Sequence, residues 1–272
     1  MASGARPTGV LREHQPRSNP SRAVDRRPTD MSSGVTLSEL AAAVASVAIL
    51  SVMLLPVLSV VREQTPELAP ERWEETIAKF EERDRETPPP ESPLLFTGSS
   101  TVVAWKTVAE DMPFAPVINR GFGGSQVSDV LYYVDRVIIA YRPRMVVLYS
   151  GDNDIAAGKD PALVLADYSA VEARIHAALP ETTLVVVSVK PSLKRWHLAE
   201  PMRQLNALLP QWAAQRERTE YLSVWDEMLG EDGQPRPELY SDGLHMTPEG
   251  YRVWTELMRP RLQALWEGEP QR

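Results

Sequence analysis

Residues 94–104 read Leu-Leu-Phe-Thr-Gly-Ser-Ser-Thr-Val-Val-Ala, and this stretch indicates the class of fold. The apolar run 94–97 is typical of a short buried strand, and Gly98 marks the turn at its end. Serine is common at a helix N-terminus, so Ser99 and Ser100 favour a helix directly after the turn. A strand that passes straight into a helix is typical of α/β proteins.

The same alternation continues along the chain. Further short apolar runs, rich in Val, Ile and Leu, occupy residues 117–119, 145–150, 183–189 and 221–224. Helical patterns lie between them, for example at residues 128–140, 161–178 and 202–216. Apolar strands that alternate with helices indicate a parallel sheet covered on both faces, joined by right-handed crossovers. Residues 93–272 are therefore predicted to form a three-layer α/β/α sandwich with a five-stranded parallel sheet.

The composition excludes several classes of function. The 272 residues carry a formal net charge of -8, so nothing suggests a basic surface for nucleic acid. The chain has no cysteine, which excludes disulfides, thiolate catalysis and Cys-type zinc sites. No two of the 4 histidines lie within helical spacing of each other, so we expect neither a metal site nor a cofactor. The histidines are His14, His176, His197 and His245.

The N-terminal part differs from the rest of the chain. Residues 1–35 are rich in Arg, Pro, Ser and Gly without an apolar period, which predicts a disordered tail. Residues 40–61 carry no charge, and a helix of that length spans roughly 33 Å, enough to cross a bilayer. A transmembrane signal anchor over residues 36–62 is the preferred interpretation, and a buried core helix is the alternative.

The Arg-rich tail favours an orientation with the N-terminus inside and the catalytic domain on the extracytoplasmic, periplasmic side. The local count of basic residues on the two sides of the span is balanced. After the span, residues 63–92 combine apolar residues at helical spacing with a run of prolines at 88–90. This pattern predicts an amphipathic helix followed by a Pro-rich linker, and a solvated stalk is the alternative.

Polar residues follow several of the predicted strands, at the sheet edge where active sites of such folds collect. Ser99-Ser100 follows the first strand, the glycine-rich residues 119–125 belong to the second, and residues 151–154, Gly-Asp-Asn-Asp, follow the third. Near the C-terminus, residues 241–245 read Ser-Asp-Gly-Leu-His before the last helix. Each block alone is ordinary turn chemistry, and their joint occurrence in chain order is what points to a site.

These residue types suit nucleophilic acyl transfer. A serine hydroxyl needs a base to take its proton, and histidine is the side chain suited to that task near neutral pH. Asp242 can orient His245 from the same short loop, and Ser100 is the candidate nucleophile. The amides of Ser100 and Gly124 and the carboxamide of Asn153 are candidate donors to the oxyanion.

The four blocks resemble those of the SGNH hydrolases, also called the GDSL esterase and lipase family, from about Trp73 to the C-terminus. Residues 98–100, Gly-Ser-Ser, stand where founding members have Gly-Asp-Ser, as in a bacterial branch of the family. The resemblance implies a flavodoxin-like SGNH fold. It also implies Ser100 rather than Ser99 as nucleophile, with Asp242 and His245 as its partners.

The resemblance implies Ser100, Gly124 and Asn153 as the oxyanion donors, although Gly123 lies beside Gly124. The one departure from the family pattern is Ser99 in place of an Asp that is not a triad member.

Together the residues and the resemblance predict a metal-independent serine esterase that forms an acyl-enzyme. Its expected substrate is a small-molecule, glycan or lipid acyl ester, with a short acyl chain expected. An acyltransferase on the same scaffold is the first alternative. A non-catalytic carbohydrate- or lipid-binding domain and a metal-dependent hydrolase are the others.

The sequence 152–154, Asp-Asn-Asp, lacks the remaining ligands of a calcium loop, and Asp154 is expected to hold its own loop by backbone hydrogen bonds.

Overall fold

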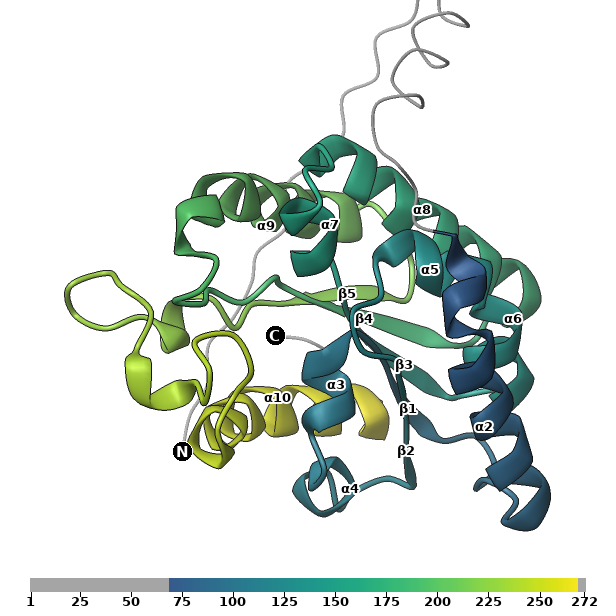
Figure 1. Cartoon of the computed structure of the whole chain (residues 1–272). Helices are drawn as coiled ribbons and strands as arrows, with labels where there is room; N and C mark the ends of the chain where they lie inside the picture. Colours follow the sequence, from purple (N-terminus) through teal and green to yellow (C-terminus); the bar gives the residue numbers. More distant parts are fainter. Residues whose placement is uncertain (1–68, 269–272) are drawn as a thin grey trace, which may run out of the picture. The chain divides into compact units, whose positions relative to one another are not determined.

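The computed structural model describes residues 69–268, drawn in colour in Figure 1. The predicted tail at residues 1–35 and the predicted membrane span at residues 40–61 lie outside the described residues. Within residues 69–268, no helix combines the length and the apolar character that crossing a membrane requires.

Five parallel strands form one sheet in the order β2-β1-β3-β4-β5 (Figure 1). The strands are β1 (Leu94–Gly98), β2 (Val117–Gly121), β3 (Met145–Tyr149), β4 (Thr183–Val187) and β5 (Thr219–Leu222). The predicted five-stranded parallel sheet is thus confirmed. Three strands differ by two residues from the predicted runs: β2 continues two residues further, β4 ends two residues earlier, and β5 begins and ends two residues earlier.

Helices cover both faces of the sheet (Figure 1). The helical segments are η1 (Pro70–Trp73), α2 (Glu74–Glu86), α3 (Ser100–Ala104), α4 (Val108–Asp111), α5 (Val127–Tyr132), α6 (Val134–Val137), η2 (Ile139–Tyr141), α7 (Asp152–Ala156), α8 (Pro161–Ala178), η3 (Trp196–Leu198), α9 (Ala199–Ala213), η4 (Asp226–Met228), η5 (Pro237–Leu239) and α10 (Pro248–Glu267).

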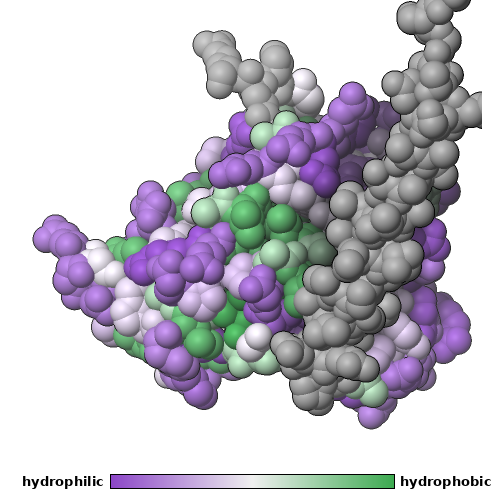
Figure 2. All heavy atoms as spheres, turned by 90° about the horizontal axis from the view of Figure 1, so that it is seen from above, coloured by the Kyte–Doolittle hydropathy of each residue, from purple (hydrophilic) through white to green (hydrophobic). Residues whose placement is uncertain are grey.

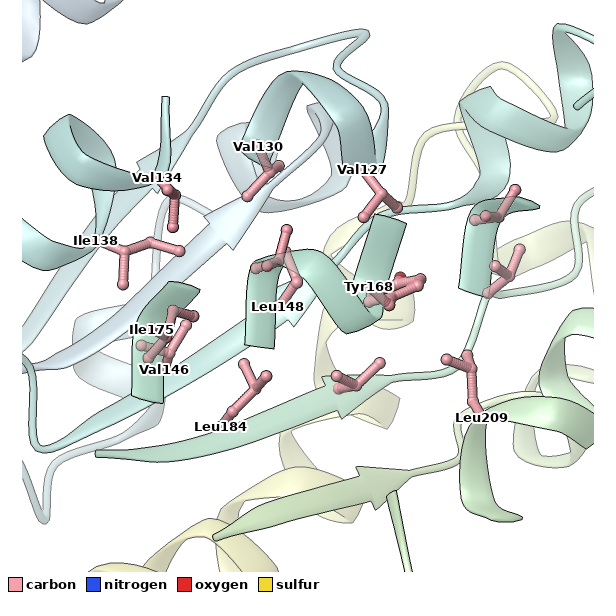
Figure 3. Packing of buried hydrophobic residues seen from close by; sticks show 14 of the residues in the cluster. Val127, Val130, Val134, Ile138, Val146, Leu148, Tyr168, Ile175, Leu184 and Leu209 are labelled. Carbon is pink, nitrogen blue, oxygen red and sulfur yellow. The ribbon is translucent and has the colours of Figure 1, made fainter. Parts of the chain in front are cut away.

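The alternation of side chains along the strands gives the domain two cores. Val146 and Leu148 of β3 pack with Leu184 of β4 against α5, α6, α8 and α9, as Figure 3 shows. Val147, which lies between them in β3, faces the opposite side of the sheet, toward α3, α4 and α10, and so does Phe96 of β1. Successive residues of a strand point to opposite faces, so strands that are buried on both faces must be apolar throughout.

The predicted helix at residues 128–140 is broken into three short segments, α5, α6 and η2. The backbone leaves helical geometry at Tyr133 and again at Ile138. β-branched residues are frequent here, and they lower helix propensity. The Tyr133 hydroxyl also donates to the backbone carbonyl of Pro70, a contact that the local sequence pattern does not contain.

The helix α2 lies against the same face as α5 and α6 (Figure 1). Its Ile77 and Phe80 are buried in the core, while the side chain of Arg136 pairs with Glu74 and Glu81 on the surface. Exposed ion pairs contribute little to stability, so the buried apolar side chains hold this helix in place. On the face seen from above in Figure 2, hydrophobic residues form a patch surrounded by hydrophilic ones.

Candidate functional site

The end of β1 approaches β3 so closely that only glycine fits at residue 98. Gly98 has a φ of 120°, and a Cβ atom built on it would lie 1.8 Å from the carbonyl oxygen of Tyr149. The amide of Ser99 then donates to that same oxygen at 3.0 Å. Since the strand must stop there, α3 begins directly afterwards with Ser100 as its first residue.

The structure brings the three predicted catalytic side chains together. The Oγ atom of Ser100 lies 3.1 Å from Nε2 of His245. On the other side of the ring, Nδ1 of His245 lies 2.8 Å from Oδ2 of Asp242. These distances form a continuous hydrogen-bonded chain from carboxylate to imidazole to hydroxyl, the arrangement that serine hydrolases use.

Asp242 also shapes the loop that carries His245. Its Oδ1 atom accepts hydrogen bonds from the amides of Leu244 at 2.9 Å and of His245 at 2.7 Å. The loop is closed by the amide of Ser241, which donates to the carbonyl of His245. Hydrogen bonds from the amide and the ring of His245, and from the amide of Leu244, hold the pKa of Asp242 well below its usual range. The carboxylate is therefore charged at neutral pH.

A second loop, residues 188–195 after β4, is hydrogen-bonded to the His245 loop. The Nζ atom of Lys190 donates to the carbonyl of Leu244 at 2.8 Å, and the amide of Lys194 donates to the carbonyl of Gly243 at 2.9 Å. Lys190 is fully buried, and burial lowers its pKa to about 8. Three consecutive residues of the His245 loop are thus fixed either by Asp242 or by this second loop.

The predicted oxyanion donors are Ser100 itself, Gly124 in the loop after β2, and Asn153 in α7. Within residues 69–268, the amides of Ser100 and Gly124 donate to no protein acceptor. Gly123 faces Ser100 directly, because a Cβ atom on Gly123 would lie 3.6 Å from that of Ser100. Gly124 follows with a φ of 82°, a left-handed conformation that favours glycine, and the ring of Trp73 lies against it. Sequence reasoning did not assign Trp73 to the site.

Asn153 reaches the same loop from α7. Its Nδ2 atom donates to the carbonyl of Ser125 at 3.0 Å, next to Gly124. Its Oδ1 atom accepts a hydrogen bond from the guanidinium of Arg195 at 2.9 Å. Sequence reasoning missed Arg195, although it stands in the polar segment that follows the fourth strand, the position that signalled the other candidates.

Asp154 holds its own loop through its main-chain carbonyl, which accepts from the amide of Lys159 at 3.0 Å, but its side chain binds a distant segment. Both oxygens of its buried carboxylate accept from the amide of Val127 at 3.2 Å, so this side chain ties α7 to the N-terminus of α5 rather than holding its own loop. Burial raises the pKa of Asp154 to about 7, against the opposing effects of Lys159 and the Val127 amide. Because Val127 is distant in sequence, no local pattern could indicate this contact.

A groove of about 520 Å³ lies between α2 and α3 and is lined by Phe80, Val103 and Val108 among others. Gly123, the residue that faces Ser100, also lines it. In the part of the chain that the structure describes, no group of three or more His, Cys, Asp or Glu side chains could hold a metal ion.

The sequence model of the GDSL-like Lipase/Acylhydrolase family matches residues 92–253, and the chain belongs to this family. No curated protein matches the chain. Among solved structures, similar folds include a protein from Bacteroides fragilis described as an acylhydrolase (20% identity, TM-score 0.62, covering 69% of this chain and 96% of that one). A GDSL-like lipase from Bacteroides thetaiotaomicron has 19% identity and a TM-score of 0.62, with 70% and 98% of the two chains covered.

A catalytic mutant of an acetylxylan esterase from Geobacillus stearothermophilus is also similar, at 14% identity and a TM-score of 0.53. That comparison covers 62% of this chain and 93% of the esterase. At these identities the likeness concerns the fold.

Proposed function

We propose that this protein is a serine esterase that hydrolyses carboxylic acyl esters through an acyl-enzyme on Ser100. The observation that carries the proposal is the hydrogen-bonded chain from Asp242 through His245 to Ser100, with successive distances of 2.8 and 3.1 Å. Membership of the acylhydrolase family supports ester hydrolysis as the general class of reaction.

In the first half of the reaction, His245 takes the proton of Ser100 while Oγ attacks the ester carbonyl carbon. The carbonyl oxygen becomes an oxyanion, and the amides of Ser100 and Gly124 and the carboxamide of Asn153 stabilise it. The tetrahedral intermediate collapses, the bond to the alcohol oxygen breaks, and the imidazolium of His245 gives its proton to the leaving alcohol. Asp242 stabilises the imidazolium throughout.

In the second half, His245 removes a proton from water, and the resulting hydroxide attacks the acyl-enzyme. The same donors stabilise the second oxyanion, and Ser100 regains its proton from His245 when the carboxylic acid leaves. No step requires a metal ion.

We also propose the substrate class from the openness of the site. The side chains of Asp242 and His245 are 48% and 40% exposed, so the alcohol part of the substrate can be large, as in an acylated glycan or lipid. The groove between α2 and α3 is a candidate space for the part of the substrate that extends past Gly123.

We further propose that residues 40–61 anchor the protein in a membrane and that the catalytic domain is extracytoplasmic. Protease protection of intact cells tests this proposal.

The experiment is hydrolysis of p-nitrophenyl acetate by the wild type, Ser100→Ala and Ser99→Ala. The expected loss in kcat for Ser100→Ala is about 10⁵-fold or more. Ser99→Ala is the matched control, because Ser99 is buried and its Oγ atom has no partner among the described residues. Activity in the presence of EDTA should be unchanged. Equal activity of wild type and Ser100→Ala would contradict the proposal.

A further inference from the structure

We propose that Arg195 is a positioning residue of the oxyanion hole, which fixes the orientation of the Asn153 carboxamide so that one of its N–H groups is free for the oxyanion formed at Ser100. This inference rests on the proposed function, since it concerns the transition state of ester hydrolysis at Ser100. Arg195 lies in the loop after β4, far in sequence from both Ser100 and Asn153.

The guanidinium of Arg195 joins two consecutive residues of α7. Its NH1 group donates to Oδ2 of Asp152 at 3.0 Å, and its NH2 group donates to Oδ1 of Asn153 at 2.9 Å. The Arg195 side chain is 18% exposed and that of Asp152 is 6% exposed, so the ion pair is largely shielded from water. A planar guanidinium held at two points has a fixed orientation, unlike a lysine ammonium.

Both neighbours of Asn153 select the same orientation of its carboxamide. Arg195 can only donate hydrogen bonds, and the carbonyl of Ser125 can only accept them. The carboxamide therefore turns Oδ1 toward Arg195 and Nδ2 toward Ser125, where it donates at 3.0 Å. A flipped amide would place two donors together on one side and two acceptors on the other.

This orientation leaves one N–H of Asn153 for the substrate. An amide nitrogen carries two hydrogens, and the carbonyl of Ser125 uses one of them. A preorganised donor is worth more than one that must reorient during the reaction. In addition, the positively charged guanidinium that donates to Oδ1 polarises the carboxamide. This strengthens the remaining N–H as a donor, because hydrogen bonds in a chain reinforce one another.

The loop that carries Arg195 is itself held firmly. The ring of Trp196 stacks on that of Trp225 at 6.0 Å, and the guanidinium of Arg203 lies over both rings. On the other side of Arg195, the amide of Lys194 bonds the His245 loop at Gly243. Arg195 is therefore anchored on both sides while its side chain reaches Asn153.

The test is a double-mutant cycle with p-nitrophenyl acetate on the full chain. Arg195→Ala is expected to lower kcat about 10-fold with KM changed less than about threefold, since only a transition-state donor is misplaced. In the Asn153→Ala background, which itself should cost about 100-fold, Arg195→Ala should cost less than about twofold. A purely structural role would give the same loss in both backgrounds, and that result would overturn the inference.

Two further variants complete the test. Lys194→Ala removes one positive charge from the same loop but keeps the main-chain amide that bonds Gly243. The Asn153 carboxamide is held by Arg195 and Ser125 and not by the Lys194 side chain, so kcat should stay within about twofold of wild type. Arg195→Lys keeps the charge but cannot hold Asp152 and Asn153 together, so its kcat should lie between those of Arg195→Ala and wild type. If Arg195→Ala does not fold, the cycle is run with Arg195→Lys.

The outcomes separate the inference from the proposed function. A wild type that neither hydrolyses esters nor reacts with a fluorophosphonate contradicts the proposed function. An active wild type whose Arg195 variants retain full kcat, or lose it equally with and without Asn153, contradicts only the role of Arg195.

Discussion

The two sides of the site are built in different ways. Ser100 stands at the end of a central strand, where Gly98 is pressed against Tyr149 and the surrounding residues are buried. Asp242 and His245 stand on an exposed loop whose shape depends on hydrogen bonds within residues 241–245 and on the loop after β4. The nucleophile is therefore placed by the core of the domain, whereas its base is placed by a local turn. Substitutions on the two sides should separate activity from stability.

The largest expected effect is a loss of activity on the exposed side. His245→Ala should lower kcat by about 10⁵-fold, because within residues 69–268 no other side chain hydrogen-bonds the Ser100 hydroxyl. Its free energy of unfolding should stay within about 1 kcal/mol of wild type, since the side chain is 40% exposed. Steady-state kinetics and urea unfolding together check this result. A large loss of stability would mean that the loop is not independent of the core.

Asp242→Asn should follow, with kcat lowered by about 10³- to 10⁴-fold. The amide can still accept from the backbone through one oxygen, but it cannot stabilise the imidazolium of His245. Kinetics with p-nitrophenyl acetate measure the loss, and unchanged far-UV circular dichroism serves as the control. A loss smaller than about tenfold would remove Asp242 from the proposed mechanism.

Gly98→Ala should do the opposite and act on stability. A Cβ atom 1.8 Å from the Tyr149 carbonyl oxygen cannot be accommodated, and the φ of 120° is strained for alanine. The free energy of unfolding should fall by about 3 kcal/mol or more. Gly158→Ala is the matched control, since Gly158 also has a positive φ but has nothing within 4 Å of the added Cβ. Similar stability of the two variants would contradict the close approach.

Lys190→Met tests the hydrogen bond between the loop after β4 and the His245 loop. It removes the donor to the carbonyl of Leu244, next to His245, and it also removes a buried charge. We expect a fall in kcat of about tenfold with a smaller change in stability, because an unpaired carbonyl costs about 1–3 kcal/mol and the lost charge offsets part of it. An unchanged kcat would show that the His245 loop does not need the hydrogen bond from Lys190.

The smallest effects concern the pH dependence of stability, and they have opposite signs for Asp154 and Asp242. The folded pKa of Asp154, about 7, lies above the ordinary value near 3.9. Its contribution is therefore fully present below about pH 4 and is lost as the pH rises toward 7. Asp242 has a lowered pKa, so its contribution is present above about pH 4 and is lost as the pH falls through its folded value.

Unfolding by urea at pH 5 and pH 8 measures the effect of Asp154. Asp154→Asn keeps an acceptor for Val127 but does not titrate, so it should gain stability relative to wild type at pH 8 compared with pH 5. A stability difference that is the same at both pH values would contradict the raised pKa.

The sequence predicts the sheet well for a physical reason. Residues 94–97 and 145–150 are continuous apolar runs because both faces of the sheet are covered, and this pattern is visible locally. Parallel strands then bring their carboxyl ends to one edge, so Ser100 after β1 and Asn153 after β3 lie at the same edge of the sheet. The His245 loop follows no strand, and its contact with Ser100 comes from the tertiary fold.

The remaining features depend on contacts between distant segments. Arg195 acts on Asn153, Asp154 bonds the amide of Val127, and Trp73 lies against Gly124. None of these pairs has a spacing that a helix or strand would impose. The contact of the Tyr133 hydroxyl with the carbonyl of Pro70 is another of this kind.

The most direct test of the central claim is to react the protein with a fluorophosphonate and map the adduct by peptide mass spectrometry. We expect one adduct, on Ser100, that is absent in Ser100→Ala, still present in Ser99→Ala and formed much more slowly in His245→Ala. An adduct on Ser99, or labelling of Ser100 that does not depend on His245, would contradict it.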